Sequence, residues 1–324
     1  MVDTEEESIG PSFDRRQVLL RGAMQRFDFV IEVDEEQSDG DIVVMRLTPD
    51  PRRYEEIEGD DGTIYVDRYT GVGISLATLQ RGFKSSTGDV QSFFLPARIG
   101  DTREYAAERL VAVRHEMDTG EHVPPAQSPD LHRPLELTVQ RPVTFLSLDV
   151  CGATRMQAED PDGFDRAFAM AFQELAATVN QFYGSIYKTT GDGFIAYVDH
   201  PSVTARDSAV DLGLSLLAVL YDSVNPALEH AGLKPLAVRI GADHGMARMR
   251  VLRSAATGFE QQEVVSDALN RAVKLQEAAD PGSFLIGEAL REQLHIGWLE
   301  RSTEVDSVLA DAVGVPGYRA FVVQ

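Results

Sequence analysis

The order of predicted elements in the second half of the chain constrains the fold more than any other feature. The apolar stretch "VTFLSLDV" (143–150) is typical of a strand buried on both faces. Apolar residues then recur at three- and four-residue spacing from Phe164 to Phe182, which predicts a long amphipathic helix. Next comes "YKTTGDGFIAYV" (187–198), in which a Gly-Asp turn between two apolar runs predicts a β-hairpin.

The remaining elements complete the pattern. We expect a helix over 204–224, strands within 236–252, a helix over 264–279, a strand and a helix within 282–294, and a last strand over 318–323. The order strand, helix, strand, strand, helix, strand predicts a ferredoxin-like α+β fold. In such a fold the helices pack on a sheet that is mainly antiparallel.

A smaller α+β domain is expected before this part of the chain. The pattern predicts strands over 27–33, 41–47, 62–74 and 92–99, and a helix over 102–117. Four prolines then interrupt any regular pattern between residues 119 and 138. We therefore expect an N-terminal domain of regulatory or unknown role over 1–120, a Pro-rich linker over 121–139, and the larger domain over 140–324.

Composition limits the possible partners. The formal net charge of −22 disfavours nucleic acids and anionic membranes as ligands. The single cysteine, Cys151, excludes an intramolecular disulfide and suits a reducing compartment. No apolar run is long enough to span a membrane, and the acidic N-terminus does not resemble a signal peptide. We expect a cytoplasmic protein without an integral membrane segment.

Two aspartates lie at positions where we expect a metal-binding site. Asp149 ends the apolar strand, and Asp192 lies in the turn of the hairpin. Because these strands are neighbours in a ferredoxin-like sheet, the two carboxylates are expected to meet at one edge. Carboxylates that close repel each other unless a cation neutralises them. Hard oxygen ligands, with no clustered Cys or His, favour Mg²⁺ or Mn²⁺.

Four motifs resemble the catalytic domain of the class III adenylate/guanylate cyclases. They are "FLSLDVCGAT" (145–154), "KTTGDGF" (188–194), "RIGADHG" (239–245) and "EVVSDALNRAVK" (263–274), in the family's order. The resemblance covers about residues 140–324. It implies a lyase that converts a nucleoside triphosphate, ATP first, to a 3′,5′-cyclic nucleotide second messenger and pyrophosphate by two-metal phosphoryl transfer.

The resemblance also implies roles for seven residues. It assigns Asp149, Asp192 and the carbonyl of Val150 to two divalent cations, Lys188 and Glu263 to the base, Asn270 to the ribose, and Lys274 to the transition state. A lysine that donates to adenine N1 and a carboxylate that accepts from its amino group favour adenine over guanine. The family's sites lie between two catalytic domains, so the resemblance implies a symmetric homodimer that shares its sites between chains.

Three positions depart from the family. Glu263 is one methylene longer than the usual aspartate, and Lys274 replaces an arginine whose fork geometry a lysine lacks. The family's late lysine, which contacts the triphosphate, has no clear match near the C-terminus. Arg248 and Arg250 are candidates for the missing cation, although exposed strand residues are the simpler interpretation of both.

Two alternatives therefore stay open. One is a pyrimidine cyclase that makes cCMP or cUMP, as in the bacterial antiphage relatives of the family. The other is a degenerate cyclase-homology domain that binds nucleotide or a partner without turnover. Both metal aspartates argue against degeneration, whereas Lys274 argues for it. A diguanylate cyclase is disfavoured, because "TGDGF" differs from the hairpin of that family.

Overall fold

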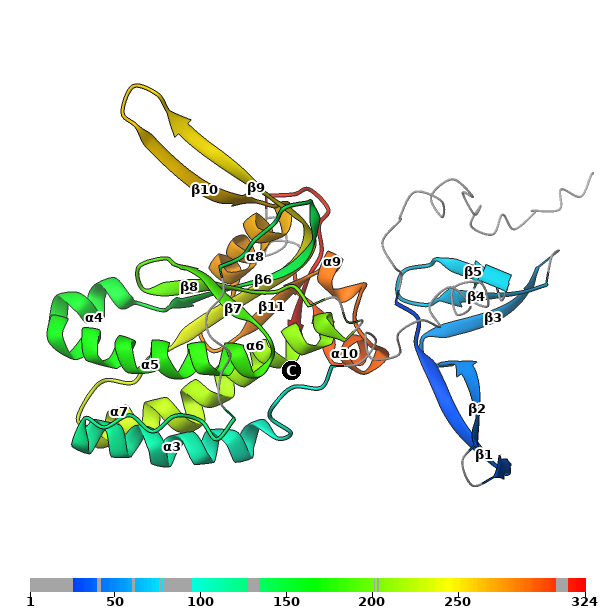
Figure 1. Cartoon of the computed structure of the whole chain (residues 1–324), viewed down its shortest axis with the longest axis horizontal. Coiled ribbons are helices and arrows are strands. Elements are labelled where there is room, and N and C mark those ends of the chain that lie inside the picture. Colours follow the sequence, from blue (N-terminus) through cyan, green and yellow to red (C-terminus); the bar gives the residue numbers. More distant parts are fainter. Residues whose placement is uncertain are drawn as a thin grey trace, which may run out of the picture. The chain divides into compact units, whose positions relative to one another are not determined.

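The computed structural model describes residues 26–39, 42–59, 62–75, 77–78, 95–127, 134–200, 202, 204–306 and 314–324. Its internal contacts divide the chain into two compact units, Met1–Gly88 and Asp89–Gln324 (Figure 1). Among the helices within the described ranges, none combines the length and apolar character needed to cross a bilayer.

The first unit contains two small antiparallel sheets. One pairs β1 (Phe29–Asp39) with β2 (Ile42–Pro49), and the other joins β3 (Tyr54–Gly59), β4 (Gly62–Asp67) and β5 (Gly73–Ser75). The predicted strands over 27–33, 41–47 and 62–74 are confirmed, the last one as two strands with a turn between them.

A buried arginine holds this unit together. The guanidinium of Arg53 forms ion pairs with Asp28 at 2.8 Å and Asp67 at 3.0 Å, and its side chain is 0% exposed. A buried charge is tolerated only when it is paired in this way. The unit therefore depends on a polar network as well as on apolar packing.

The strand predicted over 92–99 is wrong where the structure describes it. Residues 95–99 form no strand, and 92–94 lie outside the described residues. Pro96 has no backbone N–H to give to a sheet. The backbone N–H of Leu95 instead donates to Thr204 Oγ1 at 3.2 Å, and that of Arg98 to the carbonyl of Gln181 at 2.9 Å. Side-chain and backbone acceptors of the second unit thus replace a strand partner.

Helix α3 (Thr102–Thr119) belongs to the second unit, so the division falls before the predicted boundary at residue 120. The reason is that α3 packs on α6 (Ala205–Val219), η2 (Leu220–Val224) and α7 (Asn225–His230). A buried ion pair also joins α3 to α5 (Pro161–Gln181). Arg109 donates two hydrogen bonds to Glu174, at 2.7 and 2.8 Å, and both side chains are 1% exposed. Removing one partner of such a pair typically costs about 3–5 kcal/mol. The pair thus fixes α3 on α5.

The predicted linker packs on the second unit as well. Leu135 and Leu137 are buried and belong to one core cluster with Phe145 and Tyr197. Earlier in the segment, the carbonyl of Val123 accepts a hydrogen bond from Arg109 at 2.8 Å. The described parts of 121–139 are therefore not a free spacer, because apolar residues among the prolines find a place in the core.

The sheet of the second unit has eight strands in the order β12-β13-β11-β9-β6-β8-β7, with β10 paired to β9. Their bounds are β6 Arg141–Val150, β7 Ser185–Thr189, β8 Gly193–Val198, β9 Val238–Ser254, β10 Phe259–Val265, β11 Phe284–Gly287, β12 Ser302–Glu304 and β13 Ala320–Val323. The run β9-β6-β8-β7 is antiparallel at every contact, and only β11 runs parallel to β9. This order confirms the expected ferredoxin-like α+β fold.

Helices cover both faces of this sheet (Figure 1). Helix α8 (Asp267–Ala278) packs on β9 and β6 on one side, and α5 and α6 (Ala205–Val219) lie on the other. Gly241 of β9 allows the close approach of α8, since a Cβ there would lie 2.2 Å from the backbone nitrogen of Gln276. The remaining helices are α4 Ala153–Glu159, the π-helix η2 Leu220–Val224, α7 Asn225–His230, α9 Glu288–Arg291 and α10 Ile296–Glu300.

One helix begins later than predicted. The expected helix over 264–279 starts at Asp267, because Val264 and Val265 belong to β10. Ser266 is its N-cap, and the hydroxyl oxygen of that side chain accepts from the N–H of Leu269 at 3.5 Å. Glu263 therefore lies on a strand and not on the helix that carries Asn270.

Candidate active site

Asp149 and Asp192 lie together at one edge of the sheet. Asp149 is opposite Gly193 in the β6–β8 pair, and the N–H of Val150 donates to the carbonyl of Asp192 at 3.1 Å. Burial raises the pKa of the Asp149 carboxyl, and the neighbouring charge of Asp192 adds to this rise against the opposing effect of Arg239. The expectation that the two carboxylates meet is confirmed.

Glycines shape the turn that presents Asp192. Gly191 has a positive φ of 92°, a backbone angle that residues other than glycine rarely adopt. A Cβ on Gly193 would lie 2.2 Å from the carbonyl oxygen of Leu148. The hairpin can therefore lie flat against β6 only with glycine there, and this contact brings Asp192 to Asp149.

Arg239 on β9 is a site residue that the sequence did not reveal. Its guanidinium donates to Asp149 Oδ2 at 3.0 and 3.3 Å, and also to the carbonyl of Glu277 at 2.9 Å. The residue lies within "RIGADHG", and Asp149 is its cross-strand neighbour. Knowing which strands pair would have been enough to find it.

The donor set around the aspartates fits a divalent cation. The guanidinium of Arg239 pairs with Asp149 alone, so an excess of negative charge remains at Asp149 and Asp192 when both are ionised. The N–H of Val150 bonds to the carbonyl of Asp192, so the backbone of Val150 lies beside the two carboxylates. Oxygen-only sets of this kind suit Mg²⁺ or Mn²⁺.

A second acidic group lies on other elements and fits a metal less well. Potential ligand atoms of Glu116, His122 and Glu174 lie within 4.8 Å of one another. However, both carboxylate oxygens of Glu174 accept from Arg109, and His122 Nδ1 is 2.8 Å from Glu116 Oε2. The amide of Gln173 also donates to Glu116 at 2.9 Å. Protein partners already occupy this group.

The structure brings Lys188 and Glu263 into electrostatic range of each other. The hydroxyl of Tyr187, next to Lys188 on β7, accepts from the N–H of Val264 on β10 at 3.0 Å. A hydrogen bond from Arg250 lowers the pKa of the Glu263 carboxyl, and the charge of Lys188 lowers it further. Both cations therefore favour the ionised form of the Glu263 carboxyl.

Arg250 is exposed, as the sequence suggests, but it has a specific partner. Its Nη2 and Nε donate to Glu263 Oε2 at 2.8 and 3.3 Å. The two residues are cross-strand neighbours in the β9–β10 hairpin. The turn after Ser254 sets this register, so the pair could have been found from the sequence. Arg248 is opposite Val265 and is exposed.

Asn270 and Lys274 lie one turn apart on the exposed side of α8. The ammonium of Lys274 is 2.7 Å from the carboxylate of Glu277, its neighbour on the same helix. Among the described residues, no direct hydrogen bond or ion pair links either side chain to Asp149 or Asp192. Within one chain, the expected site residues thus form separate groups.

Arg271, the neighbour of Asn270, anchors the turn of α8 that carries both residues. The guanidinium of Arg271 bonds to Asp243 of β9, whose side chain is fully buried. Asp243 also accepts from the hydroxyl of Tyr318 at 2.7 Å and from the N–H of Leu290 at 3.2 Å. A buried carboxylate with this many partners fixes α8 against the sheet at the turn that carries Asn270.

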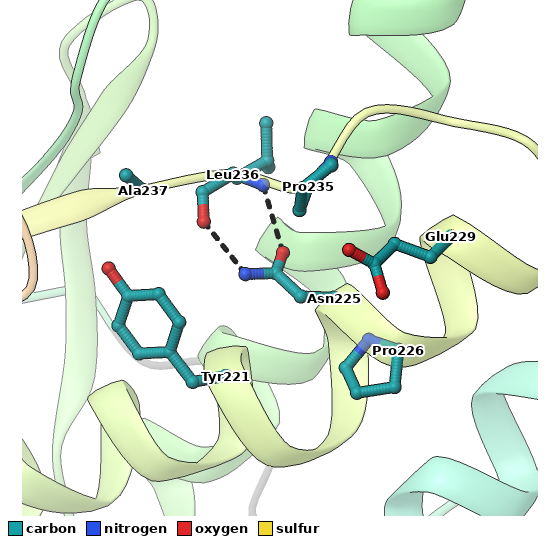
Figure 2. Close-up of a pocket in the computed structure, with 7 residues that line it drawn as sticks. All are labelled: Tyr221, Asn225, Pro226, Glu229, Pro235, Leu236 and Ala237. Carbon is teal, nitrogen blue, oxygen red and sulfur yellow. Dashed lines mark hydrogen bonds between the residues drawn. The ribbon is translucent and has the colours of Figure 1, made fainter.

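A pocket of about 400 Å³ lies elsewhere, between η2, α7 and residues 235–237 (Figure 2). Tyr221 and Glu229 line it, together with the side chain of Asn225. The Asn225 amide donates to the carbonyl of Leu236 at 2.8 Å and accepts from its N–H at 2.9 Å. None of the seven expected site residues lines this pocket.

Comparisons with known proteins give weak similarities. No protein-family model and no curated protein matches the chain. Among solved structures, the guanylyl cyclase Cya2 is 20% identical, with a TM-score of 0.47 over 57% of this chain and 92% of that one.

Two further solved structures are similar to the same extent. The adenylyl cyclase CyaB from P. aeruginosa is 18% identical, with a TM-score of 0.48 over 59% of this chain and 96% of that one. An adenylate cyclase from Trypanosoma brucei is 20% identical, with a TM-score of 0.43 over 59% and 92%. Such identities and TM-scores carry no conclusion about what this chain does.

The two candidate metal groups can be separated by a titration with Mn²⁺ followed by electron paramagnetic resonance. We expect Asp149→Asn and Asp192→Asn each to weaken Mn²⁺ binding by about tenfold or more, because even supporting residues of a metal site have effects of that size. The matched control, Glu116→Gln, should leave binding unchanged. Loss of binding in the control alone would place the metal on α3 and α5 instead.

Proposed function

We propose that residues 140–324 convert a nucleoside triphosphate, with ATP as the first candidate, to a 3′,5′-cyclic nucleotide and pyrophosphate. The observation that carries this proposal is the approach of Asp149 and Asp192 on neighbouring strands, at a turn that only glycine permits. The order of the four cyclase-like motifs supports it.

In this reaction one phosphorus–oxygen bond forms and one phosphorus–oxygen bond breaks. The ribose 3′-hydroxyl gives its proton to solvent, and its oxygen attacks the α-phosphorus in line. The bond from the α-phosphorus to the oxygen that bridges to the β-phosphorus breaks, and pyrophosphate leaves. Asp149, Asp192 and the carbonyl of Val150 would hold two divalent cations, Mg²⁺ or Mn²⁺. When bound, such ions neutralise phosphate charge and lower the pKa of the attacking hydroxyl.

The other residues bind and orient the substrate. Asn270, fixed through Arg271, would orient the ribose, and the ammonium of Lys274 would meet the charge that develops on the phosphorus oxygens. Lys188 would donate to the base, while the ionised carboxylate of Glu263 can only accept. Local cations are essential here, since the chain as a whole carries a net charge of −22.

A homodimer would bring the separate groups together. In a head-to-tail pair, the aspartates of one protomer would face Lys188, Glu263 and Asn270 of its partner, which gives two equivalent sites. The exposure of Asn270 and Lys274 on α8 agrees with such an arrangement, because both side chains are accessible to a second chain.

The direct test incubates the purified protein with each of the four ribonucleoside triphosphates and Mn²⁺, with products identified by mass spectrometry. We expect a cyclic mononucleotide, and none from Asp149→Ala or Asp192→Ala, because either loss leaves phosphate charge without its cation. Circular dichroism should show that both variants are folded. Full activity in either variant would contradict the proposal, and binding without product in the parent would indicate a degenerate domain.

Sharing of the site between chains can be tested by mixing. Asp192→Ala chains and Asn270→Ala chains should each be inactive. When the two variants are mixed, a mixed dimer contains one intact site. The mixture should therefore recover part of the activity of the parent protein. Native mass spectrometry checks that mixed dimers form, and mixed dimers without activity would rule out the shared site.

Lys274 is the clearest departure from the cyclase pattern. Lys274→Arg should raise the turnover number with little change in KM, because a fork contact would be gained mainly in the transition state. Lys274→Ala should lower turnover by about 10²-fold if the ammonium contributes a few kcal/mol. Steady-state kinetics on the three proteins decides the matter. Equal rates would mean that Lys274 serves only its neighbour Glu277 on the helix surface.

A further inference from the structure

Arg250, Glu263 and Lys188 form a row of alternating charge across three strands. Arg250 on β9 is opposite Glu263 on β10. On the other side of β10, the N–H of Val264 points to the hydroxyl of Tyr187, which precedes Lys188 on β7. The carboxylate of Glu263 therefore lies between the guanidinium of Arg250, which donates to it, and the strand that carries Lys188, whose charge acts on it.

The row keeps hydrogen-bonding capacity for a ligand. Both bonds from Arg250 end on Oε2 of Glu263, and no hydrogen bond between described residues reaches Oε1. A guanidinium has five N–H donors, of which these bonds use Nε and one Nη2 donor. The Arg250 and Glu263 side chains are 47% and 31% exposed. Exposed ion pairs of this kind contribute little to stability, so the pair can adjust to a ligand.

The order donor, acceptor, donor selects among the nucleobases. Adenine offers N1 as acceptor, its amino group as donor and N7 as acceptor. Uracil offers the same order of groups, with O4 as acceptor, N3–H as donor and O2 as acceptor. Guanine and cytosine have no edge with acceptor, donor and acceptor in succession. An unmatched polar group in a binding site costs far more than a matched one gains, so such a row discriminates strongly.

We infer that Arg250 is a specificity-determining residue, which together with Glu263 and Lys188 selects nucleotides of adenine or uracil and rejects those of guanine and cytosine. This inference rests on the proposed function for the identity of the site. It adds Arg250 to the two expected base-reading residues, and it makes a uracil nucleotide as compatible with the site as an adenine nucleotide.

The chain offers a matched control three residues along the same hairpin. Arg253 and Glu260 are also cross-strand neighbours, 2.9 Å apart, and are 68% and 56% exposed. An effect of removing a surface arginine, or of loosening the hairpin, would appear in both places. Only a role in reading the base is specific to Arg250.

The experiment measures binding, so that it does not depend on turnover. The α,β-methylene analogues of ATP, UTP, GTP and CTP are titrated into the full chain with Mn²⁺ by calorimetry. The parent should bind the ATP or UTP analogue about tenfold or more tightly than the other two. Arg250→Ala should remove that preference, Arg250→Lys should restore part of it, and Arg253→Ala should leave it intact. The tighter of the two favoured analogues identifies the base.

The outcomes separate this inference from the proposed function. A parent that prefers the GTP or CTP analogue, or an Arg250→Ala variant that behaves like Arg253→Ala, overturns the role of Arg250. Cyclic product in the activity assay would leave the proposed function standing in either case. Selective binding without any cyclic product overturns the proposed function and supports the base selection. Absence of binding by all four analogues overturns both.

Discussion

Strand β6 is the constraint on which the second unit depends. It pairs with β8 on one side and with β9 on the other, and its residues from Val143 to Leu148 are all buried. Asp149 follows directly after this buried run and is partly exposed near the C-terminal end of the strand. Its position therefore follows from two ladders of backbone hydrogen bonds, which leaves it little freedom relative to the turn at Asp192.

Buried ion pairs fasten the helices around this strand. Arg109 with Glu174 fixes α3 on α5, and Arg271 with Asp243 fixes α8 on β9. The Arg271 pair acts next to Asn270, so it influences how an exposed side chain is presented. In this acidic chain with 26 arginines and four lysines, guanidinium groups form the buried ion pairs between elements and also supply exposed hydrogen-bond donors for a ligand.

Local patterns predicted most of the second unit, because short apolar runs and a Gly-Asp turn specify strands and a hairpin without outside help. The approach of Asp149 to Asp192 also followed from strand order alone. What could not be predicted depends on contacts between distant segments. The burial of Leu135 and Leu137 and the pairing of Arg109 with Glu174 assign α3 and the linker to the second unit. Likewise, Arg239 gains its partner only through the register of β9 against β6, whereas the partner of Arg250 follows from the local β9–β10 hairpin.

The length of β9 has a consequence for communication within the molecule. One strand carries Arg239, which contacts Asp149, and Arg250, which contacts Glu263, at positions about 35 Å apart along an extended chain. In a dimer with shared sites, these two contacts would belong to different sites. A nucleotide that draws Arg250 away from Glu263 at one site would then pull on the strand that holds Arg239 at the other. Cooperativity between the two sites would travel through a single backbone, and by linkage it would act equally in both directions.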